Sequence, residues 1–422
     1  MRLELGHYIV NGTIYTNKME AILEAQRTNA EIEWVFHDKE FSKGNWLMEP
    51  NLSLDEIYKQ RALQIREKYD YVILMVSGGA DSTNMLYSFL RNNIHVDEVV
   101  GMSPISGMSN WDFNDKDKSV INTASEYKFA QFPLMHYVTE HYPRTKVTMI
   151  DTFNDMFKPK TDEWMLECQD IVNVHTTDMG RIDSLDHVKK LADAGKRIAV
   201  VMGTDKPIIT IRPDNSVFCI MGDMPVNVPK LPFKEGYPNV DRILFYWTHE
   251  MPEVPIKMAH VIAKSIFLPE NKDVYQAVLD LPKKQFAKKN DHLSTDQVLD
   301  KIITERTCLN EYNPKNFDTG FYDPHNTYQR RVPSFIYPTT WNPKTFQGGK
   351  MDDMNSFFSD NHAWFFLVHK NSRSVETMIS DFSSLYKNLS PKFLNGNKTG
   401  FKKFFKIFKI GNVSDFKPVD KL

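Results

Sequence analysis

A short segment rich in glycine and serine, Ser77 to Ser82 (SGGADS), has the residue types of an anion-binding loop. Gly78 and Gly79 lack the Cβ atoms that would block a ligand. Glycine also tolerates the positive φ values that let successive backbone N–H groups converge on an anion. Ser77 and Ser82 add hydroxyl donors, so this combination predicts that the Ser77–Ser82 loop binds phosphate.

Asp81 is the acidic residue of this loop, and its charge would repel a phosphate unless a divalent cation lay between them. Mg²⁺ in phosphate sites is commonly held by one or two carboxylates together with phosphate oxygens. We therefore expect Asp81 to be a Mg²⁺ ligand, directly or through water. The structural alternative is a flexible turn at the two glycines followed by an ordinary helix cap at Asp81 and Ser82.

The loop is expected to join a buried strand to a helix. Tyr71 to Val76 (YVILMV) is a continuous apolar run of strand length, which is typical of a strand buried on both faces of a parallel sheet. An apolar stripe at helical spacing follows the loop, formed by Met85, Leu86, Phe89 and Leu90. A phosphate in the loop would therefore meet the positive end of a helix. The spacing of the residues in this loop fits neither the Walker A motif GxxxxGK[ST] nor the dinucleotide-binding motif GxGxxG.

Strand and helix patterns alternate along the next hundred residues. Predicted strands at Val96 to Met102, Lys146 to Ile150 and Arg197 to Met202 are separated by predicted helices at Val120 to His141 and Leu185 to Ala194. Because parallel strands need long crossover connections, this alternation predicts an α/β fold with a doubly wound, mostly parallel sheet.

The residues before this region predict a small α+β segment. Asn11-Gly12 suits a two-residue turn between short strands at Tyr8 to Val10 and Thr13 to Tyr15, which indicates a hairpin. Apolar residues at helical spacing predict a helix over Leu54 to Lys68, with Ser53 as its N-cap.

The pattern changes after Gly203, where we expect the open sheet to end. Ile208 to Ile211 and Val217 to Ile220 are predicted to form a hairpin. Pro252 to Phe267 is predicted to be helical, and Asn313 to Lys350 has little periodicity. The C-terminal half is therefore expected to be mostly helical and irregular.

The segment from Arg61 to Val100 resembles the PP-loop region of the N-type ATP pyrophosphatases. Its SGGxDS signature is whole, at Ser77, Gly78, Gly79, Asp81 and Ser82. This superfamily, also called adenine nucleotide alpha hydrolase-like, includes asparagine synthetase, GMP synthetase and NAD synthetase. The resemblance implies a Rossmann-like sheet of the HUP type that binds ATP and Mg²⁺, activates a substrate carboxylate or carbonyl as an adenylate, and releases pyrophosphate.

The resemblance implies further site residues beyond the loop. The backbone at the end of the second strand would hold the adenine, here near Met102. A glycine turn after a later strand would lie beside the reacting phosphate, which is matched by Gly203 and Thr204. Asp205 would bind metal and Lys206 would neutralise charge developing on pyrophosphate, so both are candidate catalytic residues together with Asp81. The alternative for Asp205 and Lys206 is a solvated ion pair in a turn.

These interpretations divide the chain into three parts. Residues 1–69 form the hairpin and helix segment, residues 70–225 form the ATP-binding α/β domain, and residues 226–422 form a C-terminal module for substrate or partner. Trp247 to Lys264 also resembles ATP-pyrophosphatase-like proteins encoded by bacteriophages.

The chain departs from asparagine synthetases in two respects. Their glutaminase domain uses an N-terminal cysteine, whereas this chain has Arg2 and its first cysteine is Cys168. Asp205-Lys206 also replaces their acidic pair. The expected function is therefore that of an adenylate-forming ligase or amidotransferase-like enzyme without its own glutaminase. The alternatives are a nucleotide- or nucleic-acid-modifying enzyme resembling deazapurine synthases, or a non-catalytic ATP-binding module.

The overall composition excludes several other classes of protein. A formal net charge of −2 gives no global signature of nucleic-acid binding. The three cysteines are far apart, which predicts neither a disulfide framework nor a CxxC pair and favours a cytoplasmic protein. No stretch approaches the roughly 18 apolar residues of a membrane span.

Two basic segments are secondary candidates. Phenylalanines at helical spacing with lysines between them predict a basic amphipathic helix near the C-terminus, formed by Phe401, Phe404, Phe405 and Phe408. Such a helix could bind nucleic acid or anionic lipid, or pack its aromatic face on the body of the protein. Lys257 and His260 could likewise reach an anionic substrate, or Lys257 could lie on a solvated helix face.

Overall fold

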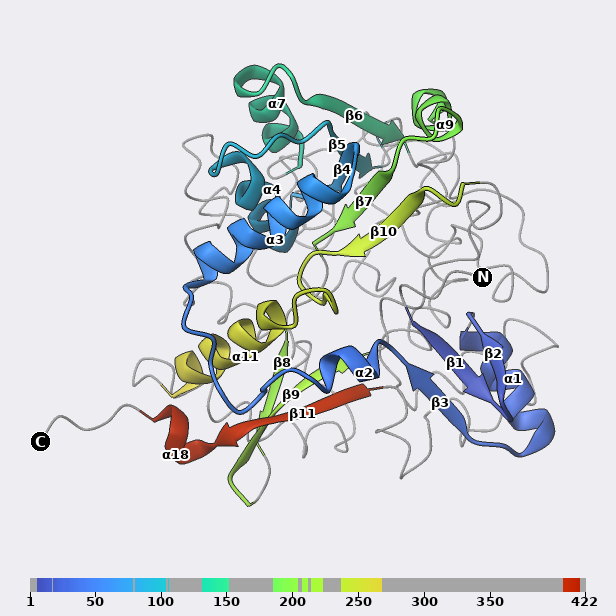
Figure 1. Ribbon diagram of the computed structural model, residues 1–422, viewed down its shortest axis with the longest axis vertical. Coiled ribbons are helices and arrows are strands. Elements are labelled where there is room, and N and C mark those ends of the chain that lie inside the picture. Colours follow the sequence, from blue (N-terminus) through green and yellow to red (C-terminus); the bar gives the residue numbers. More distant parts are fainter. Residues whose placement is uncertain are drawn as a thin grey trace, which may run out of the picture.

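A central parallel β-sheet and two smaller sheets make up the β-structure of the described residues (Figure 1). The computed structural model describes residues 6–16, 18–78, 80–103, 105, 131–151, 185–203, 207–211, 214–222, 237–267 and 405–417. None of the helices in these ranges combines the length and apolar character that a membrane crossing requires.

The central sheet has five strands, and all of its neighbouring pairs are parallel. Its strands are β4 (Tyr71–Met75), β5 (Glu98–Ser103), β6 (Lys146–Asp151), β7 (Ile198–Met202) and β10 (Val240–Leu244). The predicted α/β fold with a mostly parallel sheet is thereby confirmed.

The strand order of this sheet reverses at its centre. From β4 the chain adds β5 and β6 on one side, and it then returns to add β7 and β10 on the other side, which gives the order β10-β7-β4-β5-β6. The connections that leave the neighbouring strands β4 and β7 therefore run in opposite directions across the sheet. In open α/β sheets, ligands bind outside the carboxyl ends of the strands at such a reversal.

The prediction that this sheet ends near Gly203 was wrong. β10 pairs with β7 along its whole length, from Val240 opposite Ile198 to Leu244 opposite Met202. This strand lies beyond residue 225, where the sequence analysis placed the end of the ATP-binding domain. Its sequence, VDRIL, has two charged residues within five positions, because an edge strand is less enclosed than the apolar runs of the central strands.

Helices cover both faces of the central sheet. Val72 and Leu74 of β4 belong to one buried cluster, with α3 (Leu54–Lys68), α4 (Ala80–Leu90) and α7 (Phe132–His141). The alternate residues Ile73 and Met75 face the other cluster, to which α9 (Asp186–Asp193) contributes. Burial on both faces explains why this strand is a continuous apolar run.

The predicted helix before the loop has the predicted limits. α3 runs from Leu54 to Lys68, and its N-cap Ser53 forms a capping box with Glu56. The Ser53 hydroxyl accepts a hydrogen bond from Glu56 N at 3.2 Å, and Ser53 N donates to the Glu56 carboxylate at 2.8 Å. These bonds satisfy two backbone donors at the end of the helix, which fixes its first turn.

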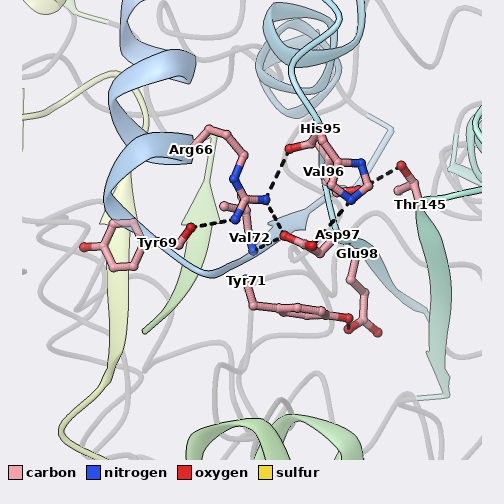
Figure 2. A network of polar contacts seen from close by, with 9 residues as sticks. All are labelled: Arg66, Tyr69, Tyr71, Val72, His95, Val96, Asp97, Glu98 and Thr145. Carbon is pink, nitrogen blue, oxygen red and sulfur yellow. Dashed lines mark hydrogen bonds and ion pairs between the residues drawn. The ribbon is translucent and has the colours of Figure 1, made fainter. Parts of the chain in front are cut away.

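A polar network ties α3 to the amino ends of β4 and β5 (Figure 2). Arg66 forms an ion pair with Asp97 and donates to Tyr69 O at 2.6 Å. Asp97 also accepts a hydrogen bond from Val72 N at 2.7 Å. One carboxylate thus holds a helix side chain and a strand backbone together.

Glu98 extends this polar edge to β6 and α9, although its side chain is fully buried. Its carboxylate accepts a hydrogen bond from Tyr71 at 3.1 Å and lies 2.7 Å from His187 Nε2. Thr148 donates to it as well, and Lys146 Nζ lies 3.5 Å away. The buried charge is therefore well compensated, and the network joins three strands to α9.

The N-terminal part forms the predicted hairpin and adds a third strand. β1 (His7–Val10) pairs with β2 (Thr13–Tyr15) and with β3 (Ile32–Val35), both antiparallel. α1 (Lys18–Thr28) connects β2 to β3, and the short α2 (Asp38–Phe41) follows β3.

The prediction of a basic amphipathic helix near the C-terminus was wrong within the described residues. Phe405–Asn412 is a strand, β11, which pairs antiparallel with β9 (Ser216–Gly222) and is followed by α18 (Val413–Phe416). The ladder with β9 satisfies its backbone, and tertiary pairing of this kind overrides local helical spacing. Phe401 and Phe404 lie outside the described residues.

The predicted hairpin at Ile208–Ile211 is confirmed as β8 paired with β9, and the predicted helix of the C-terminal half is confirmed as α11 (Glu253–Ile266). α11 packs against α3 and β8. Its Lys257 pairs with Glu49 at 2.7 Å, and His260 Nε2 lies 2.9 Å from Trp46 O. Both side chains are buried against residues 46–50, so neither lies on a solvated face.

Candidate functional site

The Ser77–Ser82 loop leaves the carboxyl end of β4, at the strand reversal, and leads directly into α4. Gly78 is buried and has φ +86°, a left-handed conformation that favours glycine. The first turn of α4 contains Asp81, whose side chain is partly exposed, and Ser82, which is 7% exposed. The predicted order of buried strand, glycine turn and helix N-terminus is therefore present.

The two serines of the loop contact each other. Ser77 N donates a hydrogen bond to Ser82 Oγ at 3.2 Å, and the two hydroxyl oxygens are 3.1 Å apart. Ser82 is buried, whereas Ser77 is exposed. The Ser82 hydroxyl thus closes the loop onto the end of β4, and Ser77 is the serine that faces solvent.

Gly203, at the carboxyl end of β7, lies directly against this loop. A Cβ atom at Gly203 would be 2.9 Å from Asp81 O, closer than real side chains approach, and 3.0 Å from Ser82 Cα. Only glycine therefore allows the end of β7 to pack against the first turn of α4. The structure thus places Gly203, the first residue of the second predicted phosphate loop, against the first turn of α4.

A buried tyrosine that the sequence analysis missed holds the first turn of α4. Tyr246 follows β10, and its hydroxyl donates to Asp81 O at 2.7 Å and accepts from Asn84 Nδ2 at 2.8 Å. Burial raises the pKa of Tyr246 well above its usual value, so the hydroxyl stays protonated and can donate. The apolar run Ile243 to Trp247 was the available signal, but β10 itself had not been predicted.

An ion pair supports the segment that carries Tyr246. Arg61 of α3 is 1% exposed, donates to Leu244 O at 3.2 Å, and pairs with Glu250 at 2.9 Å. Burial alone would raise the pKa of Glu250, but hydrogen bonds from Lys68 and Arg61 outweigh it and lower the pKa to about 2. Arg61 thereby connects α3 to the chain on both sides of Tyr246, at Leu244 and at Glu250.

Gln131, which the sequence analysis also missed, joins the ends of β4 and β5 at the start of α7. Its Nε2 donates to Val76 O at 3.0 Å and to Met102 O at 3.3 Å. Met102, the predicted adenine contact, is 9% exposed. No motif marks Gln131 in the sequence, because its role depends on two carbonyl groups brought together by the sheet.

Four residues assigned to the site lie outside the described residues. They are Gly79, Thr204, Asp205 and Lys206. Their predicted roles in phosphate binding, metal binding and catalysis therefore stay predictions.

The described residues fit a nucleotide with Mg²⁺ on two observations. Gly78 has a positive φ, which is typical of backbone segments that bind anions through their N–H groups, and Asp81 belongs to the first turn of α4, where an anion would lie. Within the described ranges no group of three or more His, Cys, Asp or Glu side chains is arranged for a metal ion. Mg²⁺ beside phosphates needs fewer protein ligands than that, because phosphate oxygens and waters complete its coordination.

Comparisons with known proteins give no relative. No family model, curated protein or solved structure matches the chain significantly. The assignment of a function therefore depends on the site itself.

Proposed function

We propose that this chain is a Rossmann-like protein of the PP-loop type that binds MgATP at the carboxyl ends of β4 and β7. The observation that carries the proposal is the position of the Ser77–Ser82 loop. It lies at the strand reversal, with Gly78 at positive φ and Gly203 packed against the helix turn that follows.

Each described residue of the candidate site has a role in this proposal. Gly78 and the first N–H groups of α4 bind phosphate oxygens, and Ser77 adds a hydroxyl. Ser82 closes the loop, and Asp81 binds Mg²⁺. Gly203 keeps the second loop in reach of the phosphates, and the backbone near Met102 contacts the base. Gly79, Thr204, Asp205 and Lys206 complete the site in the proposal, with Lys206 beside the pyrophosphate.

The proposed activity is formation of an adenylate. A carboxylate or carbonyl oxygen of the substrate attacks the α-phosphorus of ATP, the bond from that phosphorus to the β-phosphate oxygen breaks, and pyrophosphate leaves. A nitrogen or sulfur nucleophile then attacks the activated carbon, the bond from this carbon to the adenylate oxygen breaks, and AMP leaves. Bound Mg²⁺ supplies charge neutralisation for the phosphates. The chain holds the phosphates in line and donates hydrogen bonds to the leaving group, which are positioning and electrostatic effects. In this proposal the acceptor substrate binds to the part of residues 226–422 that lies outside the central sheet.

The test is release of AMP and pyrophosphate from MgATP in the presence of a pooled metabolite extract. We expect wild type to release both products and Asp81→Ala to lose the activity. Glu140→Gln serves as the control, because Glu140 is an exposed acid on α7 whose side chain is 55% exposed. Activity that persists in Asp81→Ala would refute the assigned site. Binding of ATP without release of AMP would support the alternative, a non-catalytic ATP-binding module.

A further inference from the structure

The two ends of the central sheet differ in how well their buried polar groups are satisfied. Among the described residues, the network around Asp97 and Glu98 at the amino end leaves no buried side-chain nitrogen or oxygen without a partner. At the carboxyl end, Ser103 Oγ and Gln131 Oε1 are buried and have no hydrogen-bond partner in the part of the chain that the structure describes. An unpaired buried polar atom is costly, so two of them at one place call for an explanation.

These two atoms lie beside the same strand end. Ser103 is the last residue of β5 and is fully buried, while Gln131 is 1% exposed and bonds to Met102 O, the carbonyl just before Ser103. Gly101 lies on the same face of β5 as Ser103 and packs against Met135 of α7. Both atoms therefore lie where the end of β5 meets the beginning of α7.

The orientation of the Gln131 amide is fixed by its neighbours. Nε2 donates to two backbone carbonyl oxygens, of Val76 and Met102. A flipped amide would place Oε1 against these two acceptors and would lose both bonds. Oε1 is consequently held as a hydrogen-bond acceptor, and the partner that it lacks must be an N–H or O–H donor.

We propose that Gln131 recognises the nucleoside of the bound nucleotide, with Oε1 accepting a hydrogen bond from an N–H or O–H group of the base or ribose. This inference rests on the proposed function, because it places the nucleoside beside the strand that neighbours the phosphate loop. Val76, whose carbonyl Gln131 holds, directly precedes Ser77. One side chain thereby links the nucleoside contact to the start of the loop.

The test compares ATP with analogues that each lack one donor. Dissociation constants of the magnesium complexes are measured for the full chain with ATP, purine riboside triphosphate, which lacks the 6-amino group, 2′-deoxyATP and 3′-deoxyATP. We expect one analogue to bind wild type about tenfold to a hundredfold more weakly than ATP. That analogue identifies whether the donor is the base amino group or a ribose hydroxyl.

Two variants separate recognition from structural support. Gln131→Met removes the acceptor, so the difference between ATP and the discriminated analogue is expected to fall to about twofold or less. Asn239→Leu is the matched control, because Asn239 Nδ2 also donates to two backbone carbonyls, of Ala192 at 2.8 Å and Lys196 at 2.7 Å, at the amino end of the sheet. We expect this control to keep the discrimination of wild type.

Three results would overturn the inference. Equal affinity of wild type for ATP and all three analogues would do so without any variant, so the test does not depend on the folding of Gln131→Met. The same discrimination in wild type and Gln131→Met would show that another group accepts the bond. Failure of wild type to bind MgATP would overturn the proposed function as well. The first two results would overturn only the role of Gln131, so the two kinds of failure can be distinguished.

Discussion

Gly203 is the residue whose side chain, a single hydrogen, decides how closely β7 and α4 approach. In Gly203→Ala the new Cβ would meet backbone atoms of Asp81 and Ser82, which cannot rotate away. We expect a loss of about 1 to 3 kcal/mol in the free energy of unfolding. We also expect weaker binding of MgATP, by about tenfold if the displaced turn loses about 1.4 kcal/mol of interaction. Urea unfolding and calorimetric titration measure the two effects.

The control for this substitution is Gly44→Ala. Its Cβ would lie 2.8 Å from Ile256 Cδ1, so it introduces a close contact away from the Ser77–Ser82 loop, with the end of a side chain instead of with backbone. We expect Gly44→Ala to change stability and to leave the affinity for MgATP unchanged. Equal affinities of wild type and Gly203→Ala would contradict the role given to Gly203.

The hydroxyl of Tyr246 supports the first turn of α4. Tyr246→Phe removes the hydroxyl and leaves Asp81 O and Asn84 Nδ2 without that partner, so we expect a loss of about 1 to 3 kcal/mol in unfolding free energy. Because Asp81 O belongs to the first turn of α4, affinity for MgATP should fall too. Tyr69→Phe is the control, since the Tyr69 hydroxyl bonds to Asp241 at 2.9 Å at the other end of the sheet. A loss of stability with unchanged affinity would limit Tyr246 to a structural role.

At the scale of elements, the ion pair between Arg61 and Glu250 joins α3 to the segment after β10. The pKa of Glu250 is about 2 in the folded protein, against 4.5 for the isolated group. A carboxylate with a lowered pKa stabilises the fold above the unfolded pKa, and this stabilisation is lost as the pH falls through the folded pKa. The contribution of Glu250 is therefore present at neutral pH and lost between about pH 4.5 and 2.

Glu250→Gln should reproduce this pH dependence in its difference from wild type. We expect the variant to be about 2 kcal/mol less stable at pH 7, since charge-assisted hydrogen bonds from Arg61 and Lys68 are lost. The difference should shrink steadily below pH 4.5 in urea unfolding experiments. Glu24→Gln is the control, since its partner Arg27 on α1 is 72% exposed, and we expect it to show a much smaller difference. A difference independent of pH would contradict the assigned charge state.

The elements that local sequence determines were predicted well. α3 begins and ends at the predicted residues because Ser53 and Glu56 cap it, and Tyr71–Met75 forms a strand because both its faces are buried. β10 was missed because its charged residues hide a strand that long-range pairing with β7 creates. β11 was predicted as a helix because its phenylalanines also fit helical spacing, and only the distant β9 decides otherwise.

The same distinction holds for the candidate site. The Ser77–Ser82 loop is continuous in sequence, so its motif could be read directly. Gln131 and Tyr246 act on carbonyl groups of distant residues, Met102 and Asp81, and neither belongs to a local pattern. Side chains that serve a site through such long-range bonds become visible only when the strand order is known.

At the scale of the whole molecule, β11 connects the end of the chain to its beginning. Phe408 stacks on Trp46 with ring centroids 3.8 Å apart, and Lys406 pairs with Asp38 at 2.5 Å and donates to Trp34 O at 2.6 Å. These contacts join the sheet of β8, β9 and β11 to the N-terminal residues that precede α3 (Figure 1).

Phe408→Ala should therefore destabilise the N-terminal and C-terminal parts together. We expect a loss of about 2 kcal/mol, from the apolar area and the stacked pair that are removed. Urea unfolding followed by tryptophan fluorescence measures it, and Lys409→Ala, an exposed neighbour on the same strand, is the control. An unchanged midpoint in Phe408→Ala would show that β11 contributes little to the fold.

Calorimetric titration of the full chain with MgATP tests whether the chain binds MgATP through the Ser77–Ser82 loop. Gly78→Ala and Gly195→Ala form a matched pair, because both glycines have positive φ, +86° and +78°, and only Gly78 belongs to the loop. We expect wild type and Gly195→Ala to bind MgATP, and we expect Gly78→Ala not to bind it. Absence of binding by wild type, or equal binding by Gly78→Ala, would contradict this expectation.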